Sequence, residues 1–248
     1  MERYTVVTLK QRPDLEDELN KLHHIGWTDF MREDPIADKY WGKLLAWFPE
    51  YQFILLNEES KPVACGNAIP FEWDGNDDSL PSGWDDVFEK GILDYEHHKQ
   101  SNSLSALAIV IHPEYRGEGL SDRMVKEMKS LAIQGHLKNM VAPVRPSLKC
   151  KYPLIPMEDY ISWMREDGTP FDPWIRTHAK NGATVMKVAE ESMVIPATVE
   201  EWEEWSGMKL PSSGRYIIKE GLVPLEIDKT MNKGVYVEPN VWMRHYLD

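Results

Sequence analysis

A buried strand that runs straight into a glycine turn and then a helix is the feature that most constrains this chain. Residues 104–111 (LSALAIVI) have the continuous apolar, β-branched character of a strand buried on both faces. The turn 112–119 (HPEYRGEG) carries two glycines, and an amphipathic helix follows from Leu120 until Gly135 stops it. A helix N-terminus after a glycine turn presents free backbone N–H groups and about half a positive charge to an anion. We therefore expect a phosphate or pyrophosphate to bind at this turn.

The residues of the turn suit such an anion. Arg116 adds a full positive charge at its start. Gly119 permits close approach of the backbone, and the small side chain of Ser121 leaves room for a phosphate. The anion would be held by the main-chain N–H groups of Gly117, Glu118, Gly119, Leu120 and Ser121. The alternative is a glycine turn that only connects strand and helix.

Other phosphate, nucleophile and metal motifs are missing from the sequence. The dinucleotide fingerprint G-x-G-x-x-G fails because Asp122 stands where the third glycine belongs, and there is no G-K-[ST] for a P-loop. No G-x-S-x-G elbow supports serine hydrolase chemistry. The pairs His23-His24 and His97-His98 are adjacent residues, whose side chains diverge on a helix and do not suit a metal. The sequence therefore argues against flavin, NAD, P-loop and resident metal sites.

Composition and charge narrow the class of protein. The chain has 248 residues, which suits one large domain, and it carries 28 Lys and Arg against 41 Asp and Glu. The formal net charge of -13 disfavours nucleic acid and anionic lipid as partners. No apolar window approaches a membrane span and no secretion signal pattern is present at the N-terminus, so we expect a cytoplasmic protein. Cys65 and Cys150 form no C-x-x-C pair and are expected to be reduced thiols.

Hydrophobic periodicity and turn residues predict an α/β order of elements. The predicted strands span residues 4–9, 51–56, 63–69, 104–111, 140–144, 184–188, 193–197, 216–218, 222–227 and 234–237. The predicted helices begin at Pro13 and Pro173 or span residues 36–48, 85–99, 120–134, 160–164 and 199–205. Residues 70–103 are strongly acidic, and we expect this insertion to interrupt the sheet without ending the domain.

The turn Arg116-Gly117-Glu118-Gly119-Leu120-Ser121 resembles the [QR]-x-x-G-x-[GA] signature of the GCN5-related N-acetyltransferase (GNAT) superfamily, with serine at the last position. The preceding strand, the following helix and the order of elements agree with that family. The resemblance implies an α/β fold with a mixed central sheet flanked by helices. It covers residues 1–198 as the GNAT core and leaves residues 199–248 as a β-rich C-terminal extension packed on the same domain. This extension would cover the acceptor cleft or contribute to a homodimer.

The resemblance also implies acetyl-CoA or another acyl-CoA as co-substrate, with no metal. In the family, the strand before the signature splays from its neighbour at a bulge, and its free backbone groups pair with the pantetheine arm. On this chain those residues would be Ile109, Val110 and Ile111. One of their N–H groups would polarise the thioester carbonyl, where a donor of this kind typically contributes about 3 kcal/mol of transition-state stabilisation.

Candidates for proton transfer follow from the same resemblance. Many family members place a tyrosine four residues before the glycine that ends the helix after the fifth strand, and counting back from Gly182 leads to His178. A histidine there would protonate the leaving thiolate or, through water, accept the proton of the amine. Glu72 and Asp74 after the third strand, and His112 at the end of the motif strand, are candidates for a general base.

The irregular loop 145–156 is the predicted acceptor site. Arg145 would pair with an anionic group of the acceptor, and Lys149 and Tyr152 lie in the same loop. The acidic residues between 72 and 96 favour a cationic acceptor, and a solvated surface explains them equally well.

The predicted reaction is direct transfer of an acetyl or other acyl group from acyl-CoA to an amine of a small molecule or peptide. A non-catalytic acyl-CoA binding or sensor domain is the alternative, because histidine stands where the family has tyrosine. A sensor would bind acyl-CoA without releasing free thiol. A third possibility, an α/β structural domain with an empty glycine turn, predicts no binding of acyl-CoA.

Overall fold

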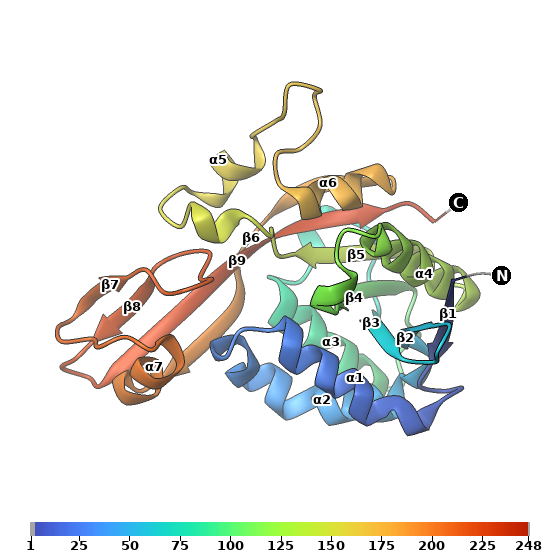
Figure 1. The fold of residues 1–248 in the computed structure, drawn as a ribbon, viewed down its shortest axis with the longest axis horizontal. Helices are drawn as coiled ribbons and strands as arrows, with labels where there is room; N and C mark the ends of the chain where they lie inside the picture. Colours follow the sequence, from blue (N-terminus) through green and yellow to red (C-terminus); the bar gives the residue numbers. More distant parts are fainter. Residues whose placement is uncertain (1–2, 248) are drawn as a thin grey trace.

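Four antiparallel strands form the first half of a mixed sheet. The computed structural model describes residues 3–247. In spatial order these strands are β1 (Tyr4–Thr8), β2 (Gln52–Asn57), β3 (Pro62–Phe71) and β4 (Ser103–Ile111). Burial extends along almost all of β2 and β3, because helices cover both faces of the sheet (Figure 1). The predicted hairpin between the second and third strands is confirmed.

The strand, glycine turn and helix predicted over residues 104–134 are confirmed. Helix α4 (Leu120–Gln134) connects β4 to β5 (Asn139–Val144), which pairs with β4 in parallel. A helical crossover of this kind is the usual connection between parallel strands. The buried face of α4 consists of Leu120, Met124, Val125, Met128 and Ala132. The glycine turn therefore lies at the carboxyl end of β4, where a parallel sheet usually binds its ligand.

Two long strands continue the nine-stranded sheet of residues 3–247 and differ from the sequence predictions. The two strands predicted at residues 184–188 and 193–197 are one strand, β6 (Ala183–Ala197), with irregular register between Ala189 and Met193. The last strand, β9 (Lys233–His245), is much longer than the predicted residues 234–237. It pairs with β5 on one side and with β6 on the other. Part of the segment expected to be an extension, residues 199–248, is therefore a central strand of the main sheet.

Pro239 explains why periodicity ended the last strand too early. Proline has no N–H to donate to a neighbouring strand, so it is rarely found in the interior of a sheet. Here Ala189 pairs with Asn240 and Met193 pairs with Glu238. Pro239 therefore lies opposite the bulged segment of β6. Residues in a bulge are not paired in the regular ladder. The N–H that Pro239 lacks therefore removes no regular hydrogen bond between β9 and β6.

Helices cover the two faces of the sheet and a small subdomain extends from it. Figure 1 shows α1 (Glu16–Gly26), α2 (Pro35–Trp47) and α3 (Trp84–Glu96) on one side, with α4 and α6 (Pro173–Lys180) on the other. The predicted helix in the acidic insertion is confirmed as α3, whose apolar face is buried. The remaining elements are α5 (Met157–Ile161), α7 (Val199–Ser206), β7 (Gly214–Tyr216) and β8 (Leu225–Asp228).

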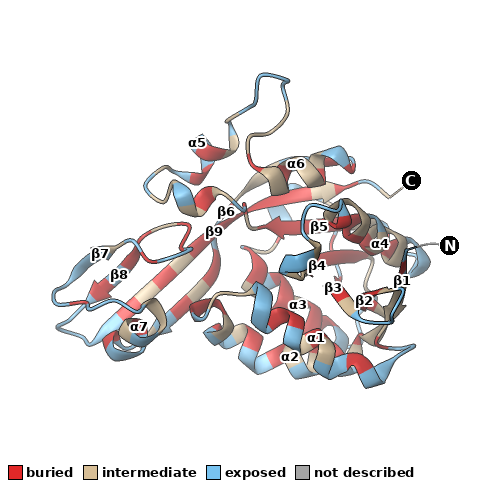
Figure 2. Cartoon of the chain, in the orientation of Figure 1, coloured by how far each residue is buried: buried red, intermediate tan, exposed pale blue. Residues whose placement is uncertain are grey.

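Burial is continuous through the sheet and its helices, and Figure 2 shows exposed residues concentrated on the outer faces of the helices and in the loops. The helix predicted over residues 199–205 is confirmed as α7, and it begins with a capping box in which Thr198 accepts from the N–H of Glu201 and Glu201 accepts from the N–H of Thr198. Within residues 3–247, none of the helices combines the length and the apolar character needed to cross a membrane.

Candidate active site

Strands β4 and β5 separate partway along their length. Their parallel pairing runs from Ser103 opposite Asn139 to Ser105 opposite Val141 and then stops. β4 continues beside β3 as far as Ile111. The second half of β4 therefore has one edge paired with β3 and one edge with free backbone groups, as the family resemblance implied.

A bulge in β4 lies at the point of separation. Ala106 pairs with Ala68 and Ala108 pairs with Asn67, which leaves Leu107 as the extra residue. The carbonyl of Leu107 accepts a hydrogen bond of 2.8 Å from the indole Nε1 of Trp84 in the first turn of α3. The carbonyl of the bulged residue thus has a hydrogen-bond partner outside the sheet.

The alternation of backbone groups shows which residues face the opened side. The N–H of His112 donates to the carbonyl of Val63 on β3 at 2.9 Å. Because backbone groups alternate between the two edges of a strand, those of Val110 also face β3, and those of Ile109 and Ile111 face away from it. The carbonyl of Ile111 accordingly accepts from Arg116 Nε at 3.3 Å. Of the three predicted residues, Ile109 and Ile111 present backbone groups to the opening, whereas the side chain of Val110 is buried beneath α1.

The glycine turn has the conformation that close backbone approach requires. Gly117 and Gly119 have φ values of 87° and 78°, in the left-handed region that favours glycine. A Cβ added at either residue would meet no atom within 4 Å, so the space beside the turn is open. α4 begins at Leu120 without a capping side chain, and Ser121 follows half-buried in its first turn. The turn can thus offer its N–H groups to a pyrophosphate.

The turn is attached to the edge of the sheet by its side chains. Glu118 accepts a hydrogen bond of 2.6 Å from the hydroxyl of Tyr4 on β1 and forms an ion pair with Arg3. The hydroxyl of Tyr115 accepts from Asn57 Nδ2 at 3.2 Å. Glu118 therefore positions the turn through its side chain and leaves only its backbone for a ligand.

Comparison with known proteins decides the family. Over 98% of its length and 93% of the relative's, the chain is 33% identical to arginine N-acetyltransferase avaD of Aspergillus versicolor. The chain belongs to the GNAT superfamily. No protein-family model matches it. As a GNAT enzyme it transfers an acyl group from acyl-CoA to an amine, so the sensor alternative and the empty structural domain are not retained.

Two solved structures share the GNAT fold along the whole chain. The loading GNATL domain of CurA from Lyngbya majuscula has a TM-score of 0.64 at 19% identity and covers 98% of both chains. The GphF GNAT-like decarboxylase, solved with isobutyryl-CoA, has a TM-score of 0.60 at 14% identity and covers 100% of both chains. At these identities the likeness concerns the fold alone. The predicted mixed sheet flanked by helices is thus confirmed.

His178 does not have the surroundings of the predicted proton donor. Its side chain is 2% exposed, and Nδ1 lies 2.9 Å from Nε2 of His245 on β9. Burial, and secondly His245, lower the pKa of His178 to about 3. The lowered pKa favours a neutral ring at physiological pH, which disfavours the imidazolium that the sequence suggested for protonating the thiolate. The other predicted role of His178, acceptance of the amine proton through water, stays a prediction.

Two of the candidate bases lie at the wrong end of β4. Phe71 pairs with Ser103 at the start of β4, so Glu72 and Asp74 are near that end. The glycine turn follows the other end, and eight residues of strand separate the two ends by about 26 Å. Glu72 forms an ion pair with Lys99, and Asp74 accepts from Ser79 within its own loop. Glu72 and Asp74 are therefore poorly placed to act as the general base.

His112 is the predicted base that lies close to the turn. It follows β4 directly, and its Nδ1 accepts from the N–H of Glu114 at 3.4 Å. Its ring packs edge-on against Tyr115 at a centroid distance of 6.0 Å. His112 is half-buried next to the free edge of β4 and stays a prediction.

The three predicted acceptor residues are engaged in internal contacts. Arg145 donates to both carboxylate oxygens of the fully buried Glu238, at 2.8 and 3.0 Å. Lys149 is fully buried, where it donates to the carbonyls of Tyr152 and Leu222, and burial lowers the pKa of its ammonium group. Tyr152 packs among aromatic side chains, with its ring centroid 5.0 Å from that of Trp163. The charged groups of Arg145 and Lys149 therefore already have partners within the protein.

The sequence patterns did not predict a pair of buried carboxyl groups, those of Asp34 and Asp85, near Trp84. Asp34 Oδ1 caps α2 by accepting from the N–H groups of Ile36 and Ala37, and Asp85 Oδ2 accepts from the N–H of Val194. Among the residues that the structure describes, the other two oxygens, Asp34 Oδ2 and Asp85 Oδ1, have no donor. The two carboxyl groups interact with each other, and burial raises the pKa of both. These surroundings favour one proton held by the pair over two ionised carboxylates.

No local motif could have revealed this pair, because the two residues are far apart in the sequence. The only local signal was Asp34-Pro35, which is typical of a helix start. The described residues contain no group of three or more His, Cys, Asp and Glu arranged to hold a metal ion.

Proposed function

We propose that this GNAT enzyme transfers an acetyl group from acetyl-CoA to the α-amine of arginine, or of a small molecule that carries arginine's guanidinium. The observation that carries the proposal is the 33% identity, over 98% of this chain, to a protein named arginine N-acetyltransferase. The α-amine is the nucleophile because the guanidinium stays protonated in any physiological solution and has no free electron pair to offer.

The carboxyl pair Asp34 and Asp85 supports a cationic acceptor. Asp85 follows Trp84 in the first turn of α3, and the indole of Trp84 reaches the carbonyl of Leu107 on β4. Asp85 is therefore the neighbour, along α3, of the residue that contacts the bulge of β4. A guanidinium has five N–H donors in a planar fork, which suits two neighbouring carboxylates. Binding of this cation would release the shared proton and satisfy the two oxygens that have no donor.

The reaction then follows from the backbone of β4 and the glycine turn. The turn would hold the pyrophosphate of acetyl-CoA, with Arg116 balancing its charge, and the pantetheine arm would pair with Ile109 and Ile111. The deprotonated α-amine attacks the thioester carbon, and a backbone N–H of β4 stabilises the oxyanion that forms. The nitrogen then loses a proton and the carbon–sulfur bond breaks, which yields the amide and the CoA thiolate. The thiolate takes up a proton to give free CoA.

A panel of acceptors tests the proposal through release of free thiol from acetyl-CoA. Arginine is expected to be turned over. Citrulline has the same length and α-amine without the positive charge, and Nα-acetylarginine has the charge without a free amine, so both are expected to be poor acceptors. Equal turnover of arginine and citrulline, or turnover of Nα-acetylarginine, would exclude the proposed recognition.

Three further expectations from the sequence stay predictions: a cytoplasmic location, the lack of a resident metal, and a homodimer. The excess of 41 Asp and Glu over 28 Lys and Arg supports a partner that is neither nucleic acid nor anionic membrane.

A further inference from the structure

The inserted helix α3 contacts the strand that is expected to bind acyl-CoA. Trp84 is 3% exposed, and its indole Nε1 donates to the carbonyl of Leu107 at 2.8 Å. Leu107 is the bulged residue of β4 and is itself 7% exposed, so water cannot easily replace this donor. An unpaired backbone carbonyl is costly in such surroundings. Without the indole, the strand would lower its free energy by shifting register and removing the bulge.

Trp84 is itself held by the strands on the far side of the opening. Its backbone N–H donates to Ser192 Oγ at 2.9 Å, and Ser192 Oγ donates to Asn240 Oδ1 at 2.7 Å. Ser192 and Asn240 are fully or almost fully buried. At Gly83, the residue before Trp84, a Cβ would lie 2.1 Å from the Cα of Ser192, so only glycine permits this close approach.

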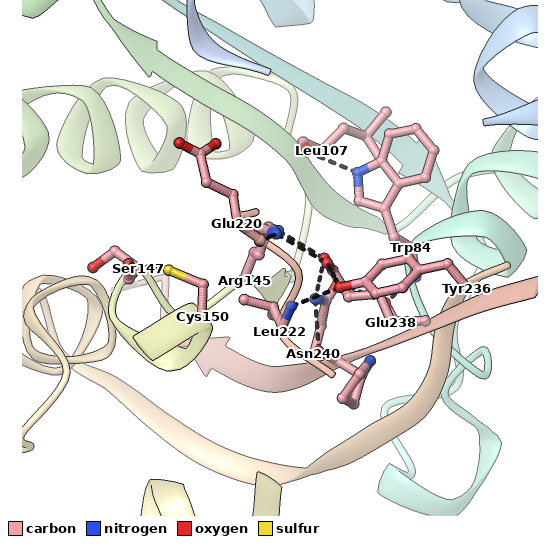
Figure 3. Close-up of polar contacts among 12 residues, drawn as sticks. Trp84, Leu107, Arg145, Ser147, Cys150, Glu220, Leu222, Tyr236, Glu238 and Asn240 are labelled. Carbon is pink, nitrogen blue, oxygen red and sulfur yellow. Dashed lines mark hydrogen bonds and ion pairs between the residues drawn. The ribbon is translucent and has the colours of Figure 1, made fainter. Parts of the chain in front are cut away.

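The same hydrogen-bonded path continues to the end of β5 (Figure 3). Asn240 Nδ2 donates to Glu238 Oε1 at 3.4 Å, and Arg145 Nε donates to the same oxygen at 2.8 Å. Arg145 directly follows β5. The path therefore begins on β4, passes through α3, β6 and β9, and ends at β5. β4 and β5 are the two strands that separate at the bulge.

We propose that Trp84 is a positioning residue for acyl transfer, and that the path Trp84–Ser192–Asn240–Glu238–Arg145, here called the brace, fixes the bulge and the separation of β4 and β5. Through the bulge, Trp84 aligns the N–H groups of Ile109 and Ile111 with the thioester. The indole touches neither the thioester nor the amine in this role. The inference rests on the acyl transfer reaction of this enzyme and is independent of whether arginine is the acceptor.

The variant Trp84→Phe separates positioning from packing. Phenylalanine keeps an aromatic ring against Trp27 and Phe88, whose ring centroids lie 5.9 and 5.2 Å from that of Trp84, but it has no N–H for Leu107. The matched control is Trp41→Phe. Trp41 also packs edge-on against Phe88, and its N–H donates to Asn20 instead of β4.

The test is the infrared carbonyl stretch of acetyl-CoA labelled with 13C at the thioester carbonyl, measured on the bound cofactor. A well-aligned N–H lowers this frequency. In Trp84→Phe we expect the shift on binding to fall to less than about half of the wild-type value, while the affinity for CoA stays within about twofold, because the glycine turn is unchanged. Trp41→Phe should keep the full shift. This readout needs no acceptor, so a failure of arginine to react leaves it valid.

Ser192→Ala is the second variant, which leaves the indole in place and cuts the brace behind it. We expect a smaller loss of the frequency shift than in Trp84→Phe, and faster amide hydrogen exchange at residues 106–108 in both variants. Retention of the full shift in both variants would overturn the proposal. So would a loss of the shift in Trp41→Phe equal to that in Trp84→Phe, because packing alone would then explain the effect.

Discussion

His178 and His245 face each other across the interface of α6 and β9, with Nδ1 of one ring 2.9 Å from Nε2 of the other. Both rings are buried, and burial lowers the pKa of His178 to about 3 and that of His245 to about 4. One neutral ring donates to the other, and this contact joins α6 to β9. Its effect should appear in stability as a function of pH.

Stability should fall steeply in mild acid. Below about pH 6.5 the unfolded chain protonates these histidines and the native chain does not. Each such histidine then lowers the unfolding free energy by about 1.4 kcal/mol per pH unit, until the native pKa is reached. Urea denaturation between pH 7.5 and pH 5 should show this loss, with a flatter profile in His178→Gln. The exposed His97→Gln is the control, and an identical profile in His178→Gln and wild type would refute the assignment.

The conformation of Gly119 should matter for cofactor binding more than for folding. Gly119→Ala places a Cβ on a left-handed residue at the expected pyrophosphate site, at a strain of about 1–2 kcal/mol. We expect the Kd for acetyl-CoA to rise about tenfold or more, measured by calorimetry. Gly168→Ala is the matched control, because Gly168 has a φ of 76° and equally open surroundings in a separate loop. Equal affinities of the two variants would place the cofactor elsewhere.

Removal of one acid of the carboxyl pair should weaken the acceptor site. Asp85→Asn keeps the size of the side chain and an oxygen for the N–H of Val194, but it removes a charge. The kcat/KM for arginine is expected to fall about 10-fold to 100-fold, the effect of losing one charge-assisted bidentate contact. The neighbouring Asp86→Asn, an exposed position, should change it little. If both variants retain full kcat/KM, the pair has no part in acceptor binding.

The ion pair of Arg145 with Glu238 should be a major contribution to stability. Glu238→Ala removes the carboxylate that accepts from Arg145 and from the Tyr236 hydroxyl and leaves Arg145 with the Glu220 carbonyl but no counter-charge, which typically costs about 3–5 kcal/mol. Chemical denaturation measures the loss. Glu226→Ala breaks the exposed pair with Arg215 and should cost less than about 1 kcal/mol. Similar losses in the two variants would contradict the view that burial makes the Glu238 contact strong.

Local features of the sequence predicted the cofactor side of the site. The two glycines and the arginine of the turn act through the backbone of their own segment, so residues 104–134 were sufficient to predict strand, turn and helix. The same holds for the helix predicted over residues 199–205, whose capping residue Thr198 has its partner three residues away. In these places the physical cause and its effect lie within a few residues.

The surroundings of the other candidate residues could not be predicted, because their contacts join distant segments. His178 looked available until β9 brought His245 against it. Likewise, Arg145 looked free until Glu238 was placed beside it, and that required recognition of a central strand through Pro239. The carboxyl pair joins the first turns of α2 and α3, which no periodicity connects. Tertiary pairing decided the roles of these residues.

The most direct test of the central claim is mass spectrometry of the product formed by the purified protein with arginine and acetyl-CoA carrying a 13C-labelled acetyl group. The account predicts arginine with one labelled acetyl group on its α-amine, formed together with an equal amount of free CoA. Release of CoA without acetylated arginine, or arginine recovered unchanged beside intact acetyl-CoA, would contradict it.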